Sequence, residues 1–299
     1  MFKRILVPLD GSEISKRALP MALAIAQHNQ GKIVLLRVPV LTKMPLPEGV
    51  EGLRLFDDTM SLRHDQCRGY LRYIEQTYVD ENVPFEVRVA EGDAASVIVD
   101  TAVAEDVDLI VMSTHGRTGF RRWVLGSVTE KVLRHATCPV LAVQDDDLPE
   151  TIMITLDGSH LAERSLEPGL ALAESLGAQV MLVRVQEPIE ALAEEERAQK
   201  WAKEVPWLHD LTESMHKDAL SYLQQIAAHY NQEHKTHMKV AVTHNYAADG
   251  IIDFAERYDV DLIVMTTHGD SGNGRWTYGS VTEKVVWSAP CAMLVIRAL

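Results

Sequence analysis

The sequence contains few cysteines, and their spacing excludes two kinds of site. Only three are present among 299 residues, at Cys67, Cys138 and Cys291. They are too few for a disulfide framework and too far apart for a Cys-x-x-Cys metal site. Because an unpaired cysteine behaves as a small apolar residue, we expect buried free thiols at these positions.

Long apolar runs are also absent. The most apolar segment, Val285 to Ile296, is interrupted by Ser288 and Pro290 and falls short of the ~18 residues that a membrane-spanning helix needs. The apolar run near the start of the chain ends at Asp10, too soon for the core of a signal peptide. These absences exclude a membrane helix and predict a cytoplasmic protein.

Positive charge is scarce relative to negative charge. The chain has 29 lysines and arginines against 43 aspartates and glutamates, which gives a formal net charge of −14 at pH 7. Nucleic acids and anionic membranes bind basic surfaces, so this balance argues against both as partners. Any phosphate that the chain holds must therefore be bound by a local feature.

What the chain does contain is a repeat of itself. The heptapeptide Asp-Val-Asp-Leu-Ile-Val-Met at residues 106–112 returns unchanged at 259–265, at an offset of 153. Near the start of each half, Leu-Asp-Gly-Ser at 9–12 returns at 156–159, at an offset of 147. A period this long indicates a duplicated domain rather than a solenoid.

Two domains follow from the length and the repeat. A chain of 299 residues has about twice the length of a typical domain. The acidic stretch from Gln144 to Glu150 has one proline and no apolar period, as is typical of a short linker. We therefore predict one domain over residues 1–145 and a second over residues 151–299.

Within each half, short β-branched runs alternate with helical patterns. The strands expected in the first half cover residues 5–9, 33–38, 85–90, 109–112 and 140–143. The second half repeats this order, and Ser12 and Ser159 can cap the helices that follow the first strand of each half. Fully apolar strands separated by helices predict two tandem α/β domains, each an open parallel sheet with helices on both faces.

An aspartate ends the first strand of each half. Ligands of open parallel sheets bind beyond the carboxyl ends of the strands, where the strand order reverses. Asp10 and Asp157 stand at such ends, and a carboxylate there can accept both hydroxyls of a ribose. Asp-Gly-Ser is also an ordinary turn and helix cap, so this signal alone is weak.

A glycine and a serine open the last helix of each half. In Gly126-Ser127-Val128 and Gly279-Ser280-Val281, free backbone amides and the helix dipole favour an anion. A glycine-rich loop is also a weak signal when it stands alone. The aspartate and the anion site would lie at the same pole of the sheet, twice in one chain, and together they indicate a nucleotide.

The nucleotide would be held by an unusual loop. Neither a Gly-x4-Gly-Lys-Ser/Thr loop nor a Gly-x-Gly-x-x-Gly fingerprint after the first strand is present. Each half instead has Gly-x9-Gly-Ser, starting at Gly116 and at Gly269. With the Leu-Asp-Gly-Ser opening and the Asp-Leu-Ile-Val-Met strand, the chain resembles the tandem form of the universal stress protein family over nearly its whole length. The ATP-binding motif of that family, Gly-x2-Gly-x9-Gly-Ser/Thr, has Ser113 or Thr266 here in place of its first glycine.

The resemblance implies a fold like that of the adenine nucleotide alpha hydrolases and an ATP site in each half. Asp10 would bind the ribose, the backbone near Leu9 and Val38 the adenine, and the glycine loop the phosphates of ATP, ADP or AMP, with Mg²⁺ or Mn²⁺ between phosphate oxygens. It implies that the following residues bind nucleotide: Pro8, Leu9, Asp10, Val38, Ser113, Gly116, Arg117, Gly126, Ser127, Val128, Leu156, Asp157, Val185, Thr266, Gly269, Gly279, Ser280 and Val281. The family also pairs domains through their last strands, which implies an internal pseudo-dimer and allows a further homodimer.

The two expected sites differ in charge. The glycine loop of the first half carries three arginines and no acid, whereas that of the second half balances Arg275 with Asp270. Residues 1–145 carry a net charge of −2, and residues 151–299 carry −9. We therefore predict that ATP binds the first half more tightly, and that the second site is weaker, empty or filled by AMP or another ligand.

No catalytic or metal-binding residue is predicted. His115 and His268 precede the loop glycines but have no nucleophile partner nearby, so a structural hydrogen bond is favoured. The spacing of His229, His234 and His237 does not place all three on one helix face, which favours a solvated surface over a metal site.

Three hypotheses of function remain. The leading one is an adenine-nucleotide-binding regulatory module of a stress response, in which ATP biases the glycine loop that meets a protein partner. A slow ATPase is an alternative, although the first half offers no clear general base beside the loop. The other alternative is a scaffold with vestigial nucleotide sites, which would bind its partner through Leu41 to Met60 and Glu187 to Leu208.

Overall fold

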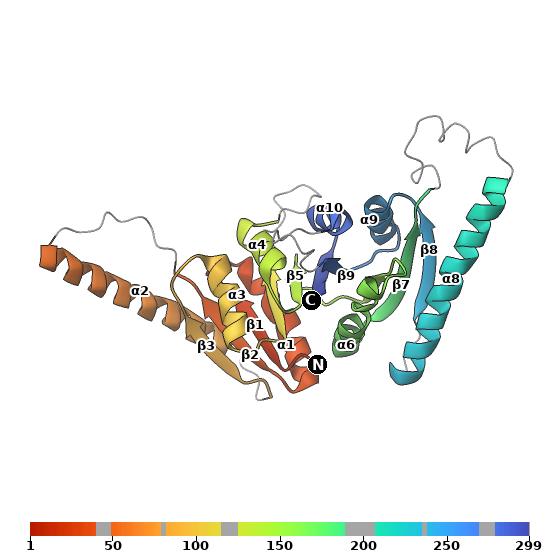
Figure 1. The fold of residues 1–299 in the computed structure, drawn as a ribbon. Helices are drawn as coiled ribbons and strands as arrows, with labels where there is room; N and C mark the ends of the chain where they lie inside the picture. Colours follow the sequence, from red (N-terminus) through yellow and green to blue (C-terminus); the bar gives the residue numbers. More distant parts are fainter. Residues whose placement is uncertain are drawn as a thin grey trace. The chain divides into compact units, whose positions relative to one another are not determined.

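A computed structural model describes residues 1–39, 49–78, 82–114, 125–188, 207–234, 238–268 and 279–298. The chain forms two compact units, the first ending at Asp147 and the second beginning at Leu148. In Figure 1 the first unit runs from red to yellow-green and the second from green to blue. Each unit is a parallel sheet with helices packed against it, as predicted for each half.

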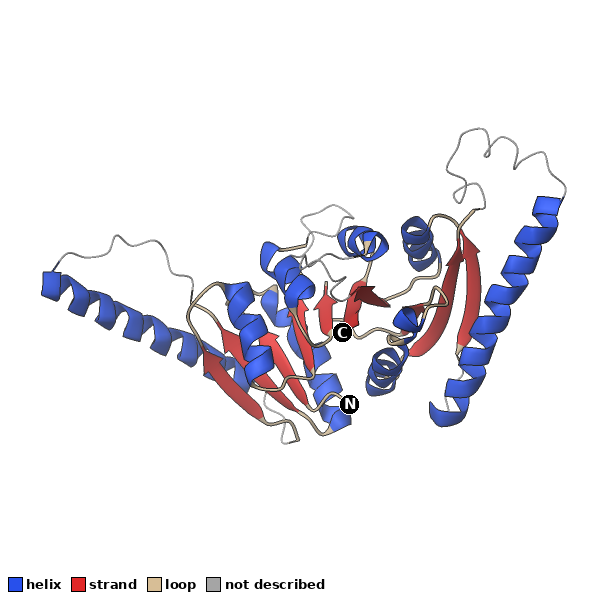
Figure 2. Ribbon diagram, in the orientation of Figure 1, coloured by secondary structure: helices blue, strands red, loops and turns tan. Residues whose placement is uncertain are grey.

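Among its described residues, the first unit has the strand order β3-β2-β1-β4-β5, and neighbouring strands are parallel. The strands are β1 Arg4–Pro8, β2 Lys32–Arg37, β3 Phe85–Val89, β4 Leu109–Ser113 and β5 Val140–Val143. The helices are the 3-10 helix η1 Ser15–Arg17, α1 Ala18–Asn29, α2 Gly49–Thr77, α3 Ala94–Ala104 and α4 Ser127–His135. Successive strand residues point to opposite faces, and Ile5, Leu6 and Val7 are all fully buried, so both faces of β1 are covered (Figure 2).

The second unit repeats this arrangement. Its described strands follow the order β10-β9-β6-β7-β8, again parallel between neighbours. They are β6 Thr151–Thr155, β7 Gln179–Gln186, β8 Lys239–His244, β9 Leu262–His268 and β10 Ala292–Ala298. The helices are α5 His160–Glu163, α6 Leu166–Leu176, α8 Trp207–His234, α9 Ala247–Arg257 and α10 Ser280–Ser288. The repeat in sequence is thus a repeat of structure, while pairing of the halves through their last strands stays a prediction.

The strand order reverses at the middle of each sheet. In the first unit the chain runs from β1 to β2 and β3 on one side, and then to β4 and β5 on the other. The reversal therefore lies between β1 and β4, and the matching point in the second unit lies between β6 and β9. The carboxyl ends of these strands are where a ligand of an open α/β sheet binds.

The repeated Asp-Val-Asp motif anchors the opposite end of each sheet. Asp108 Oδ2 accepts hydrogen bonds from the backbone N–H groups of Lys3 and Arg4, both at 2.8 Å. Asp261 Oδ2 accepts the matching bonds from Glu150 and Thr151 at 3.0 and 2.9 Å. This carboxylate ties the start of the first strand of each unit to its neighbour, so the motif serves the fold and lies away from the carboxyl ends.

The sequence argued against a disulfide framework and against a membrane-spanning helix. All three cysteines lie in the described ranges and none forms a disulfide; Cys67 and Cys291 are buried, while Cys138 is partly exposed. Desolvation by burial raises the pKa of the Cys138 thiol to about 12, so it stays protonated at neutral pH. Within the same ranges, no helix combines the length and the apolar composition needed to cross a membrane.

Candidate functional site

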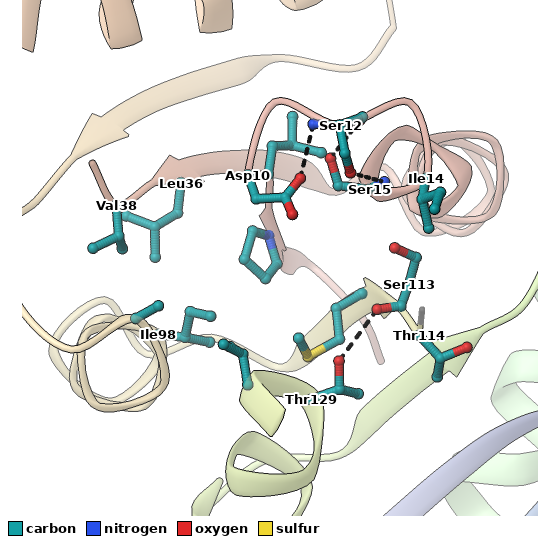
Figure 3. A pocket seen from close by; sticks show the side chains of 15 residues that line it. Asp10, Ser12, Ile14, Ser15, Leu36, Val38, Ile98, Ser113, Thr114 and Thr129 are labelled. Atoms are coloured by element: carbon teal, nitrogen blue, oxygen red, sulfur yellow. Dashed lines mark hydrogen bonds between the residues drawn. The ribbon is translucent and has the colours of Figure 1, made fainter. Parts of the chain in front are cut away.

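A cavity of about 220 Å³ opens in the first unit where β1, β2 and β4 end. Its walls come from these strand ends, the turn after β1, helix α3 and the first turn of α4. The lining residues are Pro8, Leu9, Asp10, Ser12, Ile14, Ser15, Leu36, Val38, Ala94, Ile98, Met112, Ser113, Thr114, Val128 and Thr129. Figure 3 shows the apolar side chains of Leu36, Val38 and Ile98 on one side, Ser113 and Thr114 on the other, and Asp10 between them.

The cavity brings together six of the residues that the family resemblance assigns to nucleotide binding. These are Pro8, Leu9, Asp10, Val38, Ser113 and Val128. Gly126 is the N-cap residue of α4 and Ser127 its first residue, so both lie next to the lining residue Val128. The apolar wall from α3 and Leu36 was missed, because the sequence pattern marks such residues as core without showing that they face a cavity.

The Asp10 carboxylate is fixed by the turn that follows it. Its Oδ1 accepts a hydrogen bond from the Ser12 N–H at 2.8 Å, drawn in Figure 3. Gly11 has φ +88°, a conformation that favours glycine, and this allows the sharp turn. The Ser15 N–H donates to Ser12 Oγ at 3.1 Å and the Ser15 hydroxyl donates to the Ser12 carbonyl at 2.9 Å. A carboxylate has about four acceptor positions, so Asp10 can bind the turn and a ligand hydroxyl together.

The same contacts keep Asp10 ionised. Desolvation by burial would raise the pKa of this carboxyl, but the hydrogen bonds from Ser12 and Ser15 and the nearby Arg37 outweigh it and lower the pKa below its ordinary value. The side chain is exposed to solvent at the cavity. Asp10 therefore presents a charged acceptor at neutral pH.

The first turn of α4 is held at the end of β4. The Thr129 hydroxyl donates to the Ser113 carbonyl at 3.2 Å (Figure 3), and the Gly126 N-cap has no side chain to cap the helix. The first N–H groups of a helix have no partner within it. Together with the helix dipole they form a site for negative charge beside the cavity.

The second unit places matched residues in the same local geometry. Asp157 Oδ1 accepts a hydrogen bond from the Ser159 N–H at 2.8 Å, and Gly158 between them has φ +90°. The Thr282 hydroxyl donates to the Thr266 carbonyl at 3.1 Å, as Thr129 does to Ser113 in the first unit. The turn and the helix start are therefore built alike in both units.

The remaining predicted residues of the second unit also lie at these strand and helix ends. Leu156 follows β6, Val185 lies in the last part of β7, and α10 starts with Ser280 and Val281 after the N-cap residue Gly279. Ser159 caps α5, as predicted, because its Oγ accepts the Ala162 N–H at 3.1 Å. In the first unit Ser12 makes the matching bond to Ser15, where the helix begins as η1.

Part of the predicted site falls outside the described residues. Gly116, Arg117 and Gly269 belong to this part, as do the loop charges on which the predicted difference between the halves depends. In the part of the chain that the structure describes, no group of three or more histidine, cysteine, aspartate or glutamate side chains is placed to hold a metal ion. His229 packs edge-to-face against the ring of Tyr230.

The chain is similar to proteins of one family along both halves. The model of the universal stress protein family matches residues 1–144 and again residues 149–297. Universal stress protein MJ0531 of Methanocaldococcus jannaschii is 31% identical over 144 residues, which cover 48% of this chain and 83% of that protein. Universal stress protein YxiE of Bacillus subtilis is 33% identical over 150 residues, 48% of this chain and 100% of that protein.

A solved structure extends the likeness to the whole chain. The crystal structure of a universal stress protein from Archaeoglobus fulgidus superposes with a TM-score of 0.72 and covers 98% of both chains. Sequence identity is 20%, so this likeness is one of fold. The family model, by contrast, matches each half by sequence. The chain therefore belongs to the universal stress protein family and carries two tandem copies of its domain.

Proposed function

We propose that this protein binds an adenine nucleotide, ATP foremost, in the first unit, and that it acts as a nucleotide-responsive regulatory module. The observation that carries the proposal is the cavity at the reversal of strand order, with Asp10 between an apolar wall and the start of α4. A nucleotide has a flat aromatic base whose faces pack on apolar groups, a ribose with two hydroxyls and a charged phosphate chain, in that order. The cavity offers matching surfaces in the same order.

Each part of the ligand has a defined counterpart. Leu36 and Ile98 are buried and, with Val38, form an apolar wall for the base. The ionised Asp10 accepts hydrogen bonds from the ribose hydroxyls, and the backbone N–H groups of the first turn of α4 bind phosphate. Mg²⁺ or Mn²⁺ would be held mainly by phosphate oxygens, because the described residues provide no cluster of metal ligands.

Identification of a retained ligand tests the proposal. The purified chain is denatured and the released small molecules are identified by mass, and the chain freed of ligand is then heated with and without ATP·Mg²⁺. We expect released adenine nucleotide, or an increase in unfolding temperature of roughly 5–10 °C when ATP is about 100-fold above its Kd. Release of ADP with measurable turnover would instead indicate a slow ATPase. Absence of both ligand and thermal shift would contradict nucleotide binding and favour a scaffold.

The lowered pKa of Asp10 predicts the pH dependence of binding. Adenosine is the appropriate ligand, because it lacks the phosphate groups that titrate in ATP, and the Asp10→Asn variant corrects for protonation of the adenine ring at low pH. The ionised carboxylate accepts the ribose hydroxyls, so the affinity for adenosine should stay constant from pH 8 down to about pH 4, the ordinary carboxyl range, and fall below it as Asp10 is protonated. Calorimetry across this range measures the profile. Asp10→Asn is the control, because it removes the titrating group; a loss of affinity that already begins near pH 6 in the wild type would contradict the assignment.

A further inference from the structure

Behind the Asp-Gly-Ser turn of each unit lies an arginine stacked on a tyrosine. Arg37, the last residue of β2, has its guanidinium carbon 4.5 Å from the ring centroid of Tyr70 on α2. In the second unit, Arg184 of β7 lies 5.6 Å from the ring centroid of Tyr222 on α8. Each arginine also packs against the turn, because a Cβ added at Gly11 would meet the guanidinium of Arg37. The matching approach occurs between Gly158 and Arg184.

One position of this region carries a charge of opposite sign in the two units. Lys16 of the first unit and Glu163 of the second stand at the same offset of 147 as the aspartates of the two turns. Each contacts the residue three positions before it, Lys16 in an ion pair and Glu163 through a histidine ring nitrogen. Lys16 Nζ lies 2.6 Å from Glu13 Oε1, and Glu163 Oε2 lies 3.3 Å from Nδ1 of His160.

The two members of each pair differ in exposure. The side chain of Glu13 is 86% exposed and that of Lys16 only 20%. His160 is fully exposed and Glu163 only 28%. We call the more exposed member of each pair the outer residue and the less exposed member, Lys16 or Glu163, the inner residue. Water and salt screen the outer residue much more than the inner one, so the charge of the inner residue determines the local electric field. That inner residue is a cation in the first unit and an anion in the second.

The inner residue belongs to the same cluster as the aspartate and the arginine. Arg37 contacts both the Tyr70 ring and the turn that follows Asp10. Burial raises the pKa of the Tyr70 hydroxyl, while the charges of Lys16 and Arg37 lower it and that of Asp10 raises it, so this hydroxyl senses all three charges. In the second unit, burial and then Glu163 raise the pKa of Tyr222, whose hydroxyl donates to Glu163 Oε1 at 2.9 Å. Aspartate, arginine and inner residue sum to one positive charge in the first unit and to one negative charge in the second.

We propose that Lys16 and Glu163 determine the charge of the ligand that each site accepts. Lys16 directly follows the cavity-lining Ser15 and favours adenosine compounds with a phosphate chain in the first unit. Glu163 disfavours such a chain and leaves the second unit selective for adenosine or for weakly charged derivatives. This inference rests on the proposed function, extends it to the matched turn and helix start of the second unit, and does not depend on the charges of the glycine loops.

Calorimetry with ATP·Mg²⁺ and with adenosine tests this selectivity in the full chain. Asp157→Ala serves as the background for the first site and Asp10→Ala as the background for the second. Lys16→Glu should weaken ATP binding at the first site about fivefold and change adenosine binding less than about twofold, because only ATP carries charge. Glu163→Lys should strengthen ATP binding at the second site by a similar factor. Both effects should shrink at high salt.

The outer residues provide the matched control. Glu13→Lys changes the charge of the first unit by as much as Lys16→Glu, but at an exposed position, and should leave the ratio of ATP to adenosine affinity nearly unchanged. Retained adenosine binding shows that each variant is folded. An unchanged ratio in Lys16→Glu, or an equal effect of Glu13→Lys, would overturn the inference while the proposed function stands. Absence of binding of either ligand to the wild type would contradict the proposed function itself.

Discussion

Replacing Asp10 by alanine should lower the affinity of the first unit for adenosine by about 10- to 100-fold. Hydrogen bonds to a charged group are worth roughly 1.5–3 kcal/mol, and each 1.4 kcal/mol changes a dissociation constant about tenfold. The loss should be smaller for ATP than for adenosine, because the substitution also removes a negative charge that lies beside the cavity and repels the phosphate chain. Calorimetry in the Asp157→Ala background, which leaves one site to titrate, measures the effect directly.

Asp10→Asn separates the two roles of this side chain. In the wild type, Oδ1 accepts the Ser12 N–H and shapes the turn. Asparagine keeps one carbonyl oxygen for that bond but replaces the other acceptor with an amide donor and removes the charge. We expect most of the affinity loss to persist in this variant while the unfolding temperature stays near that of the wild type. Wild-type affinity in Asp10→Asn would show that the carboxylate does not bind the ribose.

The second large effect concerns stability. Asp108→Ala should lower the free energy of unfolding of the first unit by about 2–4 kcal/mol, because it leaves the N–H groups of Lys3 and Arg4 without their charged acceptor. Asp108→Asn retains one acceptor oxygen and should cost about 1 kcal/mol. Hydrogen exchange followed by mass spectrometry locates the change, since peptides from β1 and β4 should exchange faster.

Asp261→Ala is the counterpart in the second unit. It removes the acceptor of Glu150 and Thr151, and faster exchange should appear in peptides from β6 and β9. Each variant should affect mainly its own unit, so the two act as controls for one another. Unchanged exchange at the start of β1 in Asp108→Ala would contradict the anchoring role of this motif.

Much of the fold could be predicted from the sequence because the strands are buried on both faces. Continuous apolar runs such as Ile5 to Leu9 marked the strands, and the repeat showed that one sheet occurs twice. The position of the cavity followed from the rule for open sheets, which led to Asp10 and Val38. The cavity walls from Leu36 and Ile98 could not be predicted, because an apolar residue facing a cavity has the same pattern as one in the core.

Letter-for-letter identity between the halves marks residues that hold the fold together as well as residues of the candidate site. The longest identical strand motif, residues 106–112 and 259–265, contains the carboxylates that anchor the sheet at its amino ends. Arg37 and Lys16 were missed, since their importance depends on Tyr70, which is more than thirty positions away in the chain and is brought near only by the packing of α2. A lysine and a glutamate at matched positions become informative once their burial is known.

The anchoring of β1 also has a practical consequence for attaching the protein to a surface. The amino group of Met1 donates to Asn29 Oδ1 at 3.1 Å, and Lys3 and Arg4 are held by Asp108, so the first residues lie at the amino ends of the strands. In a parallel sheet the amino ends of the strands lie opposite their carboxyl ends, where the cavity opens. A biotin or fluorophore joined ahead of Met1 would therefore leave the mouth of the cavity facing the buffer, which suits immobilised binding assays of the first unit.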